Sequence, residues 1–245
     1  MTAIQSYHQQ LVKTLDEAFE CQSEALEAAA EYLSQTLHSG GMIYTFGTGH
    51  GHLLALEGFY RAGGLARVCP VLDEKLMLHI SAASSTMEER DVRWVDTLLA
   101  RFPMKKGDSL IIFSNSGRNA VPVELALSAR ERGVRVIAVT SLKHTLSVTS
   151  RAPSGRRLCE VADLVLDNCG VPGDAALSFA DGASVGPTST AVGAALLQAV
   201  ICRVKERSLE QGFDAEFFMS SNVDGGDAFN EELIRRYRDQ IPGLA

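Results

Sequence analysis

One stretch limits the folds open to this chain, because Asp108–Gly133 joins a buried strand, a polar loop and an amphipathic helix with almost nothing between them. Ser109–Phe113 is a short apolar run flanked by turn residues, which predicts a strand buried on both faces. Val121–Arg132 repeats apolar residues at helical spacing, and Gly133 is the expected helix stop. A strand that passes directly into a helix is the unit from which helix-covered parallel sheets are built.

The loop inside this stretch has the chemistry of an anion site. It consists of Ser114, Asn115, Ser116, Gly117, Arg118 and Asn119. Where a parallel strand gives way to a helix, the unpaired N–H groups of the first turn and the helix dipole favour a bound anion. An ordinary turn with Asn119 as N-cap is the alternative, but it leaves the two serines unexplained. We interpret the loop as a phosphate cradle.

A second unit of the same design lies earlier in the chain. Met42–Phe46 predicts the first strand, and Leu53–Arg61 predicts the helix that follows it. The loop between them is Gly47, Thr48, Gly49, His50, Gly51 and His52, whose alternating glycines let the backbone approach a ligand closely. This loop is neither a Walker A loop nor a dinucleotide fingerprint. The two histidines either contact a ligand or cap the helix.

A third polar cluster opens an apolar helix. Thr188, Ser189 and Thr190 precede Ala191–Val204, a segment so apolar that it must be buried on most sides. Capping uses one hydroxyl and leaves two unexplained, so we predict further phosphate contacts here.

Two other segments are interpreted as surface structure. Ser147–Leu158 contains a proline, a glycine and three arginines, which is typical of a mobile loop, with a lid over the phosphate as the alternative. Asp227 is expected to be the N-cap of a last, charged helix that ends near Gln240, rather than part of a metal site.

Strands and helices alternate along the chain. Further strands are predicted over Arg67–Leu72, Val134–Thr140 and Asp163–Asp167. This alternation predicts an α/β fold with a parallel sheet between two helical layers, in which ligands bind beyond the carboxyl ends of the strands. The three polar clusters all fall at such positions.

The N-terminal segment, residues 1–40, is rich in Glu and Ala and predicts one long helix or two ahead of the rest of the domain, residues 41–245. This is more helix than one sheet needs for cover. We therefore expect its apolar stripe to pack on a second subunit.

Composition excludes several functions. The net charge of −7 and a pI near 5.4 argue against a nucleic-acid partner, which requires a basic surface. Five scattered cysteines without a C-x-x-C motif predict neither disulfides nor zinc, and no cofactor is implied. The first residues, MTAIQSYHQQLVK, lack the apolar core of a signal peptide, and no apolar run approaches the roughly 18 residues needed to span a membrane. We expect a cytoplasmic protein with reduced thiols.

The motifs GTGHGH, SNSGRN and TST together resemble the sugar isomerase (SIS) phosphosugar-binding domain. Stretches such as FGTGHGHLLALEGFYRAGG and VGPTSTAVGAALLQA are similar to a bacterial group of SIS proteins, the UPF0309-like proteins, and the likeness covers most of the chain. It implies a flavodoxin-like, three-layer α/β/α sandwich with a mainly parallel five-stranded sheet, and a homodimer or homotetramer with sites near the interfaces. The implied phosphate contacts are Ser114, Ser116, Asn119, Thr188, Ser189 and Thr190.

The resemblance also implies a reaction class. The wider family includes aldose–ketose isomerases and the etherase that removes lactate from N-acetylmuramic acid 6-phosphate, many with a glutamate on the helix after the first glycine loop. That helix offers Glu57, and a second etherase-like glutamate falls near Glu88 or Glu89. Such chemistry needs a base and a proton donor. We predict Glu57 as the base and His79 or Glu89 as its partner, with an ion pair between Glu57 and Arg61 as the alternative.

Two function classes remain open. The first is an enzyme, isomerase or etherase-like, that acts on a phosphorylated sugar or amino sugar. The second is a non-catalytic module that senses such a sugar, as SIS domains do in transcription regulators. The chain carries no recognisable DNA-binding helix pair or basic patch, which favours the enzyme.

Overall fold

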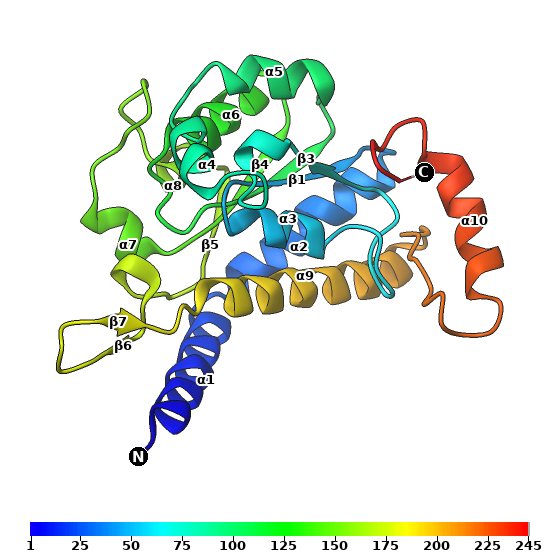
Figure 1. The fold of residues 1–245 in the computed structure, drawn as a ribbon. Helices are drawn as coiled ribbons and strands as arrows, with labels where there is room; N and C mark the ends of the chain where they lie inside the picture. Colours follow the sequence, from blue (N-terminus) through cyan, green and yellow to red (C-terminus); the bar gives the residue numbers. More distant parts are fainter. Residues whose placement is uncertain (245) are drawn as a thin grey trace.

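The fold is organised around a five-stranded parallel sheet, seen in Figure 1 in the computed structural model, which describes residues 1–244. Neighbouring strands pair in parallel in the order β2-β1-β3-β4-β5. They are β1 (Ile43–Gly47), β2 (Val68–Val71), β3 (Ser109–Phe113), β4 (Arg135–Thr140) and β5 (Leu164–Asp167). After β2 the chain crosses β1 to form β3 on its other side. Ligands of such sheets bind at this reversal, beyond the carboxyl ends of β1 and β3.

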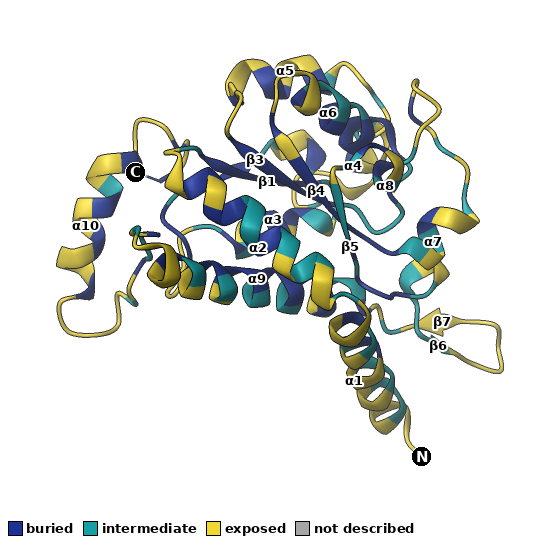
Figure 2. Cartoon of the chain, turned by 180° about the vertical axis from the view of Figure 1, so that it is seen from behind, coloured by how far each residue is buried: buried dark blue, intermediate teal, exposed yellow. Residues whose placement is uncertain are grey.

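Helices cover both faces of the sheet, which confirms the predicted three-layer sandwich (Figure 1). One layer contains α5 (Trp94–Arg101), α6 (Ala120–Glu131) and α8 (Leu158–Val161), with α10 (Gly226–Tyr237) at its edge, and the other contains α2 (Ser23–His38), α3 (Gly51–Glu57) and α9 (Ser189–Gln211). Along β3, Leu110 and Ile112 pack in the first layer, and Ile111 and Phe113 pack in the second. Both faces are therefore buried, as the continuous apolar run predicts (Figure 2).

The predicted N-terminal helical segment is two helices with different roles. α1 (Ala3–Cys21) projects from the body, and only Thr14 and Ala18 are buried on it (Figures 1 and 2). α2 begins after a break at Gln22 and buries a stripe that includes Leu33 against the sheet. Thus α2 is part of the core, whereas α1 leaves most of its surface exposed.

Short elements fill the connections that show no clear sequence period. They are the 3₁₀ turns η1 (Glu74–Leu76) and η2 (Pro172–Asp174), the helices α4 (Ala82–Glu88) and α7 (Leu142–Ser147), and an antiparallel hairpin of β6 (Leu177–Ser178) and β7 (Ser184–Val185). Among residues 1–244, no helix combines the length and apolar character that crossing a membrane requires.

The predicted boundaries of three helices are wrong. α3 ends at Glu57 rather than Arg61, and shortly afterwards Tyr60 adopts a left-handed backbone with φ of 40°, which a helix does not tolerate. α9 continues past its apolar part to Gln211, where Gly212 ends it with φ of 70°. The N-cap of α10 is Gly225 rather than Asp227, and this helix ends at Tyr237 rather than near Gln240.

Candidate functional site

A cavity of about 410 Å³ lies beyond the carboxyl ends of β1 and β3. The loops after these two strands form much of its wall, and segments before α5, after β4 and before α9 complete it. The predicted site residues that line it are Thr48, Gly49, His50, Glu89, Ser114, Asn115, Ser116, Asn119, Ser189 and Thr190. The cavity therefore brings together the three polar clusters singled out in the sequence.

Two glycines allow the loop after β1 to pack tightly against the end of β3. A Cβ atom at Gly47 would collide with the backbone of Gly51, and one at Gly51 would collide with the carbonyl oxygen of Phe113. Only residues without a side chain fit at these positions. Gly47 and Gly51 thus allow the loop after β1 to contact the end of β3, at the point where the strand order reverses.

The loop after β3 has a strongly polarised backbone. All five carbonyl oxygens of Asn115–Asn119 accept hydrogen bonds within the protein; the donors include the hydroxyls of Thr140 and Thr145 and the N–H groups of Ser141, Leu158, Arg151 and Val123. None of the five N–H groups of the same residues donates a hydrogen bond to another group within residues 1–244. A run of unpartnered N–H groups ahead of a helix is a binding nest for an anion.

Gly117 makes this loop conformation possible. Its φ is 56°, and a Cβ atom there would lie 2.9 Å from the hydroxyl oxygen of Thr145 and 3.2 Å from that of Thr140. Those hydroxyls hold the carbonyl groups of the loop. A side chain at this position would therefore disturb both the backbone and the groups that orient it.

Glu89 connects the two loops. One oxygen of its carboxylate accepts a hydrogen bond from the Thr48 hydroxyl, and the other accepts one from Nδ2 of Asn119, each at 2.7 Å. Its backbone carbonyl accepts the N–H of Val121, in the first turn of α6. Burial raises the pKa of Glu89, while the Thr48 hydrogen bond and two nearby arginines oppose the shift. The site thus contains an oriented carboxyl group whose proton affinity is increased.

His144 is a cavity residue that the sequence interpretation missed. It lies in α7, four residues after the end of β4, where Thr140 and Ser141 mark the carboxyl edge of the sheet. Burial lowers its pKa, Asp174 opposes the shift, and Arg118 adds to it. Its Nδ1 is buried without a hydrogen-bond partner within residues 1–244. A neutral imidazole of this kind can donate or accept a proton.

The start of α9 already holds a carboxylate. Asp174 Oδ1 accepts the N–H groups of Thr188 at 3.2 Å and Ser189 at 3.0 Å, and Oδ2 accepts the Ser189 hydroxyl. Thr188 is buried and does not line the cavity. The prediction that all three hydroxyls contact phosphate is therefore corrected. The Thr188 hydroxyl is buried outside the cavity wall and the Ser189 hydroxyl already donates to Asp174, whereas Thr190 lines the cavity and makes no such bond.

Several predicted residues lie outside the cavity wall. Glu57 forms an ion pair with Arg61 and accepts a hydrogen bond from Gln198 Nε2 at 3.1 Å, as the structural alternative predicts. His79 is exposed in a different cavity, near η1. His52 is only 4% exposed, and burial lowers its pKa. The other predicted residues that do not line the cavity are Gly47, Gly117, Arg118 and Thr188.

The backbone of the Ser147–Leu158 segment is hydrogen-bonded to the loop after β3, residues 114–119. The N–H of Arg151 donates to the carbonyl of Arg118 at 2.7 Å, and the N–H of Leu158 donates to that of Gly117 at 2.8 Å. These bonds attach the segment at two points. The backbone of the segment that the sequence interprets as a surface loop therefore helps to orient the N–H groups of the loop after β3.

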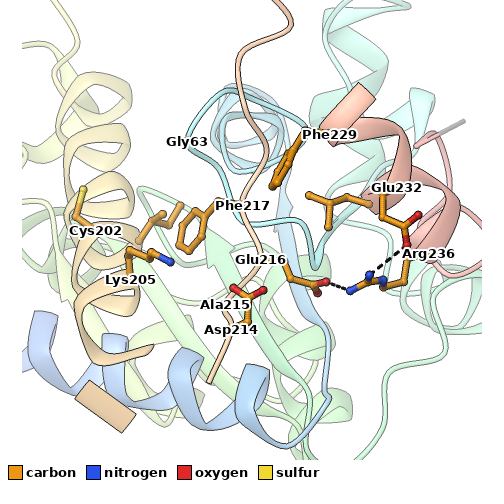
Figure 3. Close-up of a pocket in the computed structure, with 12 residues that line it drawn as sticks. Gly63, Cys202, Lys205, Asp214, Ala215, Glu216, Phe217, Phe229, Glu232 and Arg236 are labelled. Carbon is orange, nitrogen blue, oxygen red and sulfur yellow. Dashed lines mark hydrogen bonds and ion pairs between the residues drawn. The ribbon is translucent and has the colours of Figure 1, made fainter. Parts of the chain in front are cut away.

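A second cavity, of about 680 Å³, lies between α9, residues 214–217 and α10 (Figure 3). Its wall is mainly apolar, with Ile201, Phe217 and Phe229 among its residues. Arg236, on its rim, is paired with Glu216 and Glu232. This cavity offers apolar surface but lacks the polarised backbone found beyond β3.

Within residues 1–244, no group of three or more His, Cys, Asp or Glu residues is arranged to hold a metal ion.

Comparison with known proteins defines the family. The family model of the SIS domain matches residues 6–141, so the chain belongs to the SIS domain family, and the resemblance seen in the sequence is confirmed. The chain is 41% identical over 243 residues to a UPF0309 protein of Halalkalibacterium halodurans, covering 99% of this chain and 97% of that protein. It is 39% identical over 242 residues to a UPF0309 protein of Listeria monocytogenes serotype 4b, covering 98% of each.

Solved structures share the fold at low sequence identity. Phosphoheptose isomerase GmhA from Neisseria gonorrhoeae aligns with a TM-score of 0.55 and 19% identity, over 83% of this chain and 97% of that one. The sugar isomerase domain of the RpiR transcription factor from Sphaerobacter thermophilus gives 0.52 and 21%, over 86% and 96%. The Vibrio vulnificus NanR protein complexed with ManNAc-6P gives 0.52 and 15%, over 99% and 71%. The architecture is thus that of SIS proteins.

Proposed function

We propose that the protein binds a phosphorylated sugar or amino sugar, with the phosphate held by the loop after β3. The observation that carries this proposal is the polarity of Asn115–Asn119, whose carbonyl groups are all engaged while their N–H groups have no partner within residues 1–244. Ser114 and Ser116 line the same cavity and supply hydroxyl donors. SIS proteins of the same fold include a phosphoheptose isomerase and a protein complexed with ManNAc-6P, which supports this ligand class.

The proposed activity is proton transfer on that sugar, as in an aldose–ketose isomerase or an etherase-like lyase. Glu89 is the base in this proposal, because it lines the cavity, is oriented by Thr48 and Asn119, and has a raised pKa. His144, neutral and in the same cavity, is the proposed proton donor or acceptor at the second atom. Glu57 has no part in this mechanism, since its carboxylate is paired with Arg61 outside the cavity wall.

A non-catalytic sensor is the second candidate. The sugar isomerase domain of a transcription factor shares this fold, so the architecture alone serves either role. The partly buried carboxyl group of Glu89 in the cavity favours catalysis, because binding a neutral sugar ring does not require a base of raised pKa.

The first experiment is a thermal-shift screen of sugar and amino-sugar phosphates, each paired with its dephosphorylated form. Only the phosphorylated member of an active pair should raise the melting temperature, and equal responses would contradict the phosphate assignment. Ser116→Ala should weaken binding by about 1.5–3 kcal/mol with little loss of stability. Ser128→Ala, in α6 and outside the cavity wall, is the control and should bind as the wild type does.

Conversion of each binding sugar is then followed by NMR in deuterated solvent. An enzyme of the proposed class incorporates deuterium next to the carbonyl or releases a product. If every sugar phosphate that binds remains unchanged and unlabelled, the protein is a sensor.

A further inference from the structure

Three arginines beside the cavity have no carboxylate partner of their own. Arg118 belongs to the loop after β3. Arg151 belongs to the Ser147–Leu158 segment, which is hydrogen-bonded to that loop, and Arg90 follows Glu89 in the sequence. None of the three forms an ion pair within residues 1–244, although eleven other arginines of the same chain do so. The positive charge next to the nest is therefore only partly balanced.

The contacts place Arg118 and Arg151 close to one another. The N–H of Arg151 donates to the carbonyl of Arg118 at 2.7 Å. The Arg118 guanidinium reaches Thr149 Oγ1 through Nη2 at 3.3 Å, and Arg151 Nη1 lies 3.4 Å from Asn119 Oδ1. These are long, neutral contacts, and Nε of Arg118 is buried without a partner within residues 1–244. Much of the hydrogen-bonding capacity of both side chains is unused.

The electrostatics agree with this geometry. The pKa of Arg151 lies below its ordinary value, first because of desolvation and then because Arg118 and Arg90 repel its charge. Glu89 is the carboxylate that opposes this shift, and its two oxygens already accept Thr48 and Asn119. An added anion would relieve the repulsion between the guanidinium groups.

We infer that Arg118 and Arg151 form a second anion subsite beside the phosphate nest, so that the ligand is a sugar phosphate with a second acidic group, either a carboxylate or another phosphate. Guanidinium groups are suited to this role because their N–H forks match both anions. Neither arginine lines the cavity that the nest borders, so the second group is a different part of the ligand from the phosphate in the nest. The inference rests on the proposed function and narrows its substrate class.

The test uses ligand pairs that differ in the second acidic group. N-acetylmuramic acid 6-phosphate is compared with N-acetylglucosamine 6-phosphate, which lacks the lactyl carboxylate, and fructose 1,6-bisphosphate is compared with fructose 6-phosphate. Dissociation constants are measured by calorimetry at fixed ionic strength. In at least one pair, the more acidic member should bind the wild type roughly 10- to 100-fold more tightly. A preference in the first pair identifies the second acidic group as a carboxylate, and a preference in the second pair identifies it as a phosphate.

Three variants locate the effect. Arg151→Ala should remove most of the preference for the acidic member while binding of its monophosphate partner changes less than about threefold. Arg151→Lys keeps the charge but loses the fork, and should retain part of the preference. Arg156→Ala is the control, because it removes the same charge from the same segment while its guanidinium contacts Glu160. It should keep the full preference.

The outcomes separate the inference from the proposed function. Equal affinities within both pairs, or a preference that Arg151→Ala and Arg156→Ala reduce alike, would overturn the second subsite while phosphosugar binding stands. If no sugar phosphate binds at all, the proposed function fails and the inference fails with it. Arg151 is exposed, so its variants test the subsite without disturbing the core.

Discussion

The hydroxyl of Thr48 donates a 2.7 Å hydrogen bond to Oε2 of Glu89, and this bond links two segments that are 41 residues apart. Because Asn119 occupies the other carboxylate oxygen, Glu89 is held between the loops after β1 and β3. The carboxyl group is thus fixed at the reversal of the strand order, where ligands of this fold class bind. A base held in this way needs no rearrangement before it accepts a proton.

Replacing Glu89 by Gln should lower turnover by about 10²–10⁴-fold while ligand affinity changes little, because the amide keeps the size of the side chain but cannot act as a base. The measurement uses a sugar phosphate that the wild type converts, with deuterium incorporation followed by NMR. Unchanged incorporation in the variant would remove Glu89 from the mechanism.

Glu57→Gln is the matched comparison, because it makes the same change at the glutamate that the family resemblance favours. Its carboxylate is about one-third exposed and paired with Arg61. The loss of that pair should cost less than about 1 kcal/mol of stability and leave turnover intact. A large loss of turnover in this variant would show that Glu57, rather than Glu89, acts as the base.

Glu89 should also make stability depend on pH. Its pKa is raised in the folded protein, so folding favours the protonated form. Below the unfolded pKa, about 4.3, both states are protonated and the contribution is fully present. As the pH rises through the folded pKa, ionisation of the partly buried carboxyl group removes this contribution. Urea unfolding between pH 4 and 7 should show the wild type losing stability relative to Glu89→Gln; a constant or opposite difference would contradict the raised pKa.

The sequence predicts the sheet well, because its strands are short, continuous apolar runs. Ser109–Phe113 is both the predicted and the observed β3, and the polar loops after the strands could be placed at one edge from the parallel order alone. Helix ends were predicted less well. The end of α3 depends on the left-handed backbone at Tyr60, which no local residue preference indicates.

Site contacts between distant segments could not be derived from spacing. Asp174 lies in a stretch without a period, yet its carboxylate caps α9, fourteen and fifteen residues later. His144 follows β4 closely, and a search of all side chains just beyond the strand ends could have found it. The pairing of Glu57 with Arg61 was within reach of sequence reasoning, since residues four apart on a helix are neighbours.

Gly117→Ala should destabilise the protein by more than its left-handed backbone alone explains. A Cβ atom in that conformation costs about 1–2 kcal/mol, and the 2.9 Å approach to Thr145 adds roughly 1–3 kcal/mol of overpacking. Gly155→Ala is the control, because φ there is also positive, at 70°, but nothing lies within 4 Å. Urea unfolding should show a larger loss for Gly117→Ala, with weaker phosphosugar binding. Equal losses would contradict the close packing.

The final prediction concerns self-association through α1. This helix projects from the body, and its exposed apolar side chains include Ile4 at 82%, Val12 at 40% and Phe19 at 39%. We expect a homodimer or homotetramer in which this surface is covered by a second copy, because burial of apolar area drives association. Light scattering at micromolar concentration should give a mass of at least twice 26.4 kDa. A monomer at this concentration would contradict the prediction.

Val12→Glu should weaken this association by roughly tenfold or more, because an unpaired carboxylate would be buried at the contact. Val223→Glu is the matched control. It makes the same substitution at a valine that is 50% exposed, in the loop before α10, and Figure 1 shows α10 and α1 at opposite ends of the molecule. The control should associate as the wild type does. If the two variants dissociate alike, added charge rather than the α1 surface controls assembly, and if neither dissociates, the subunits meet through another face.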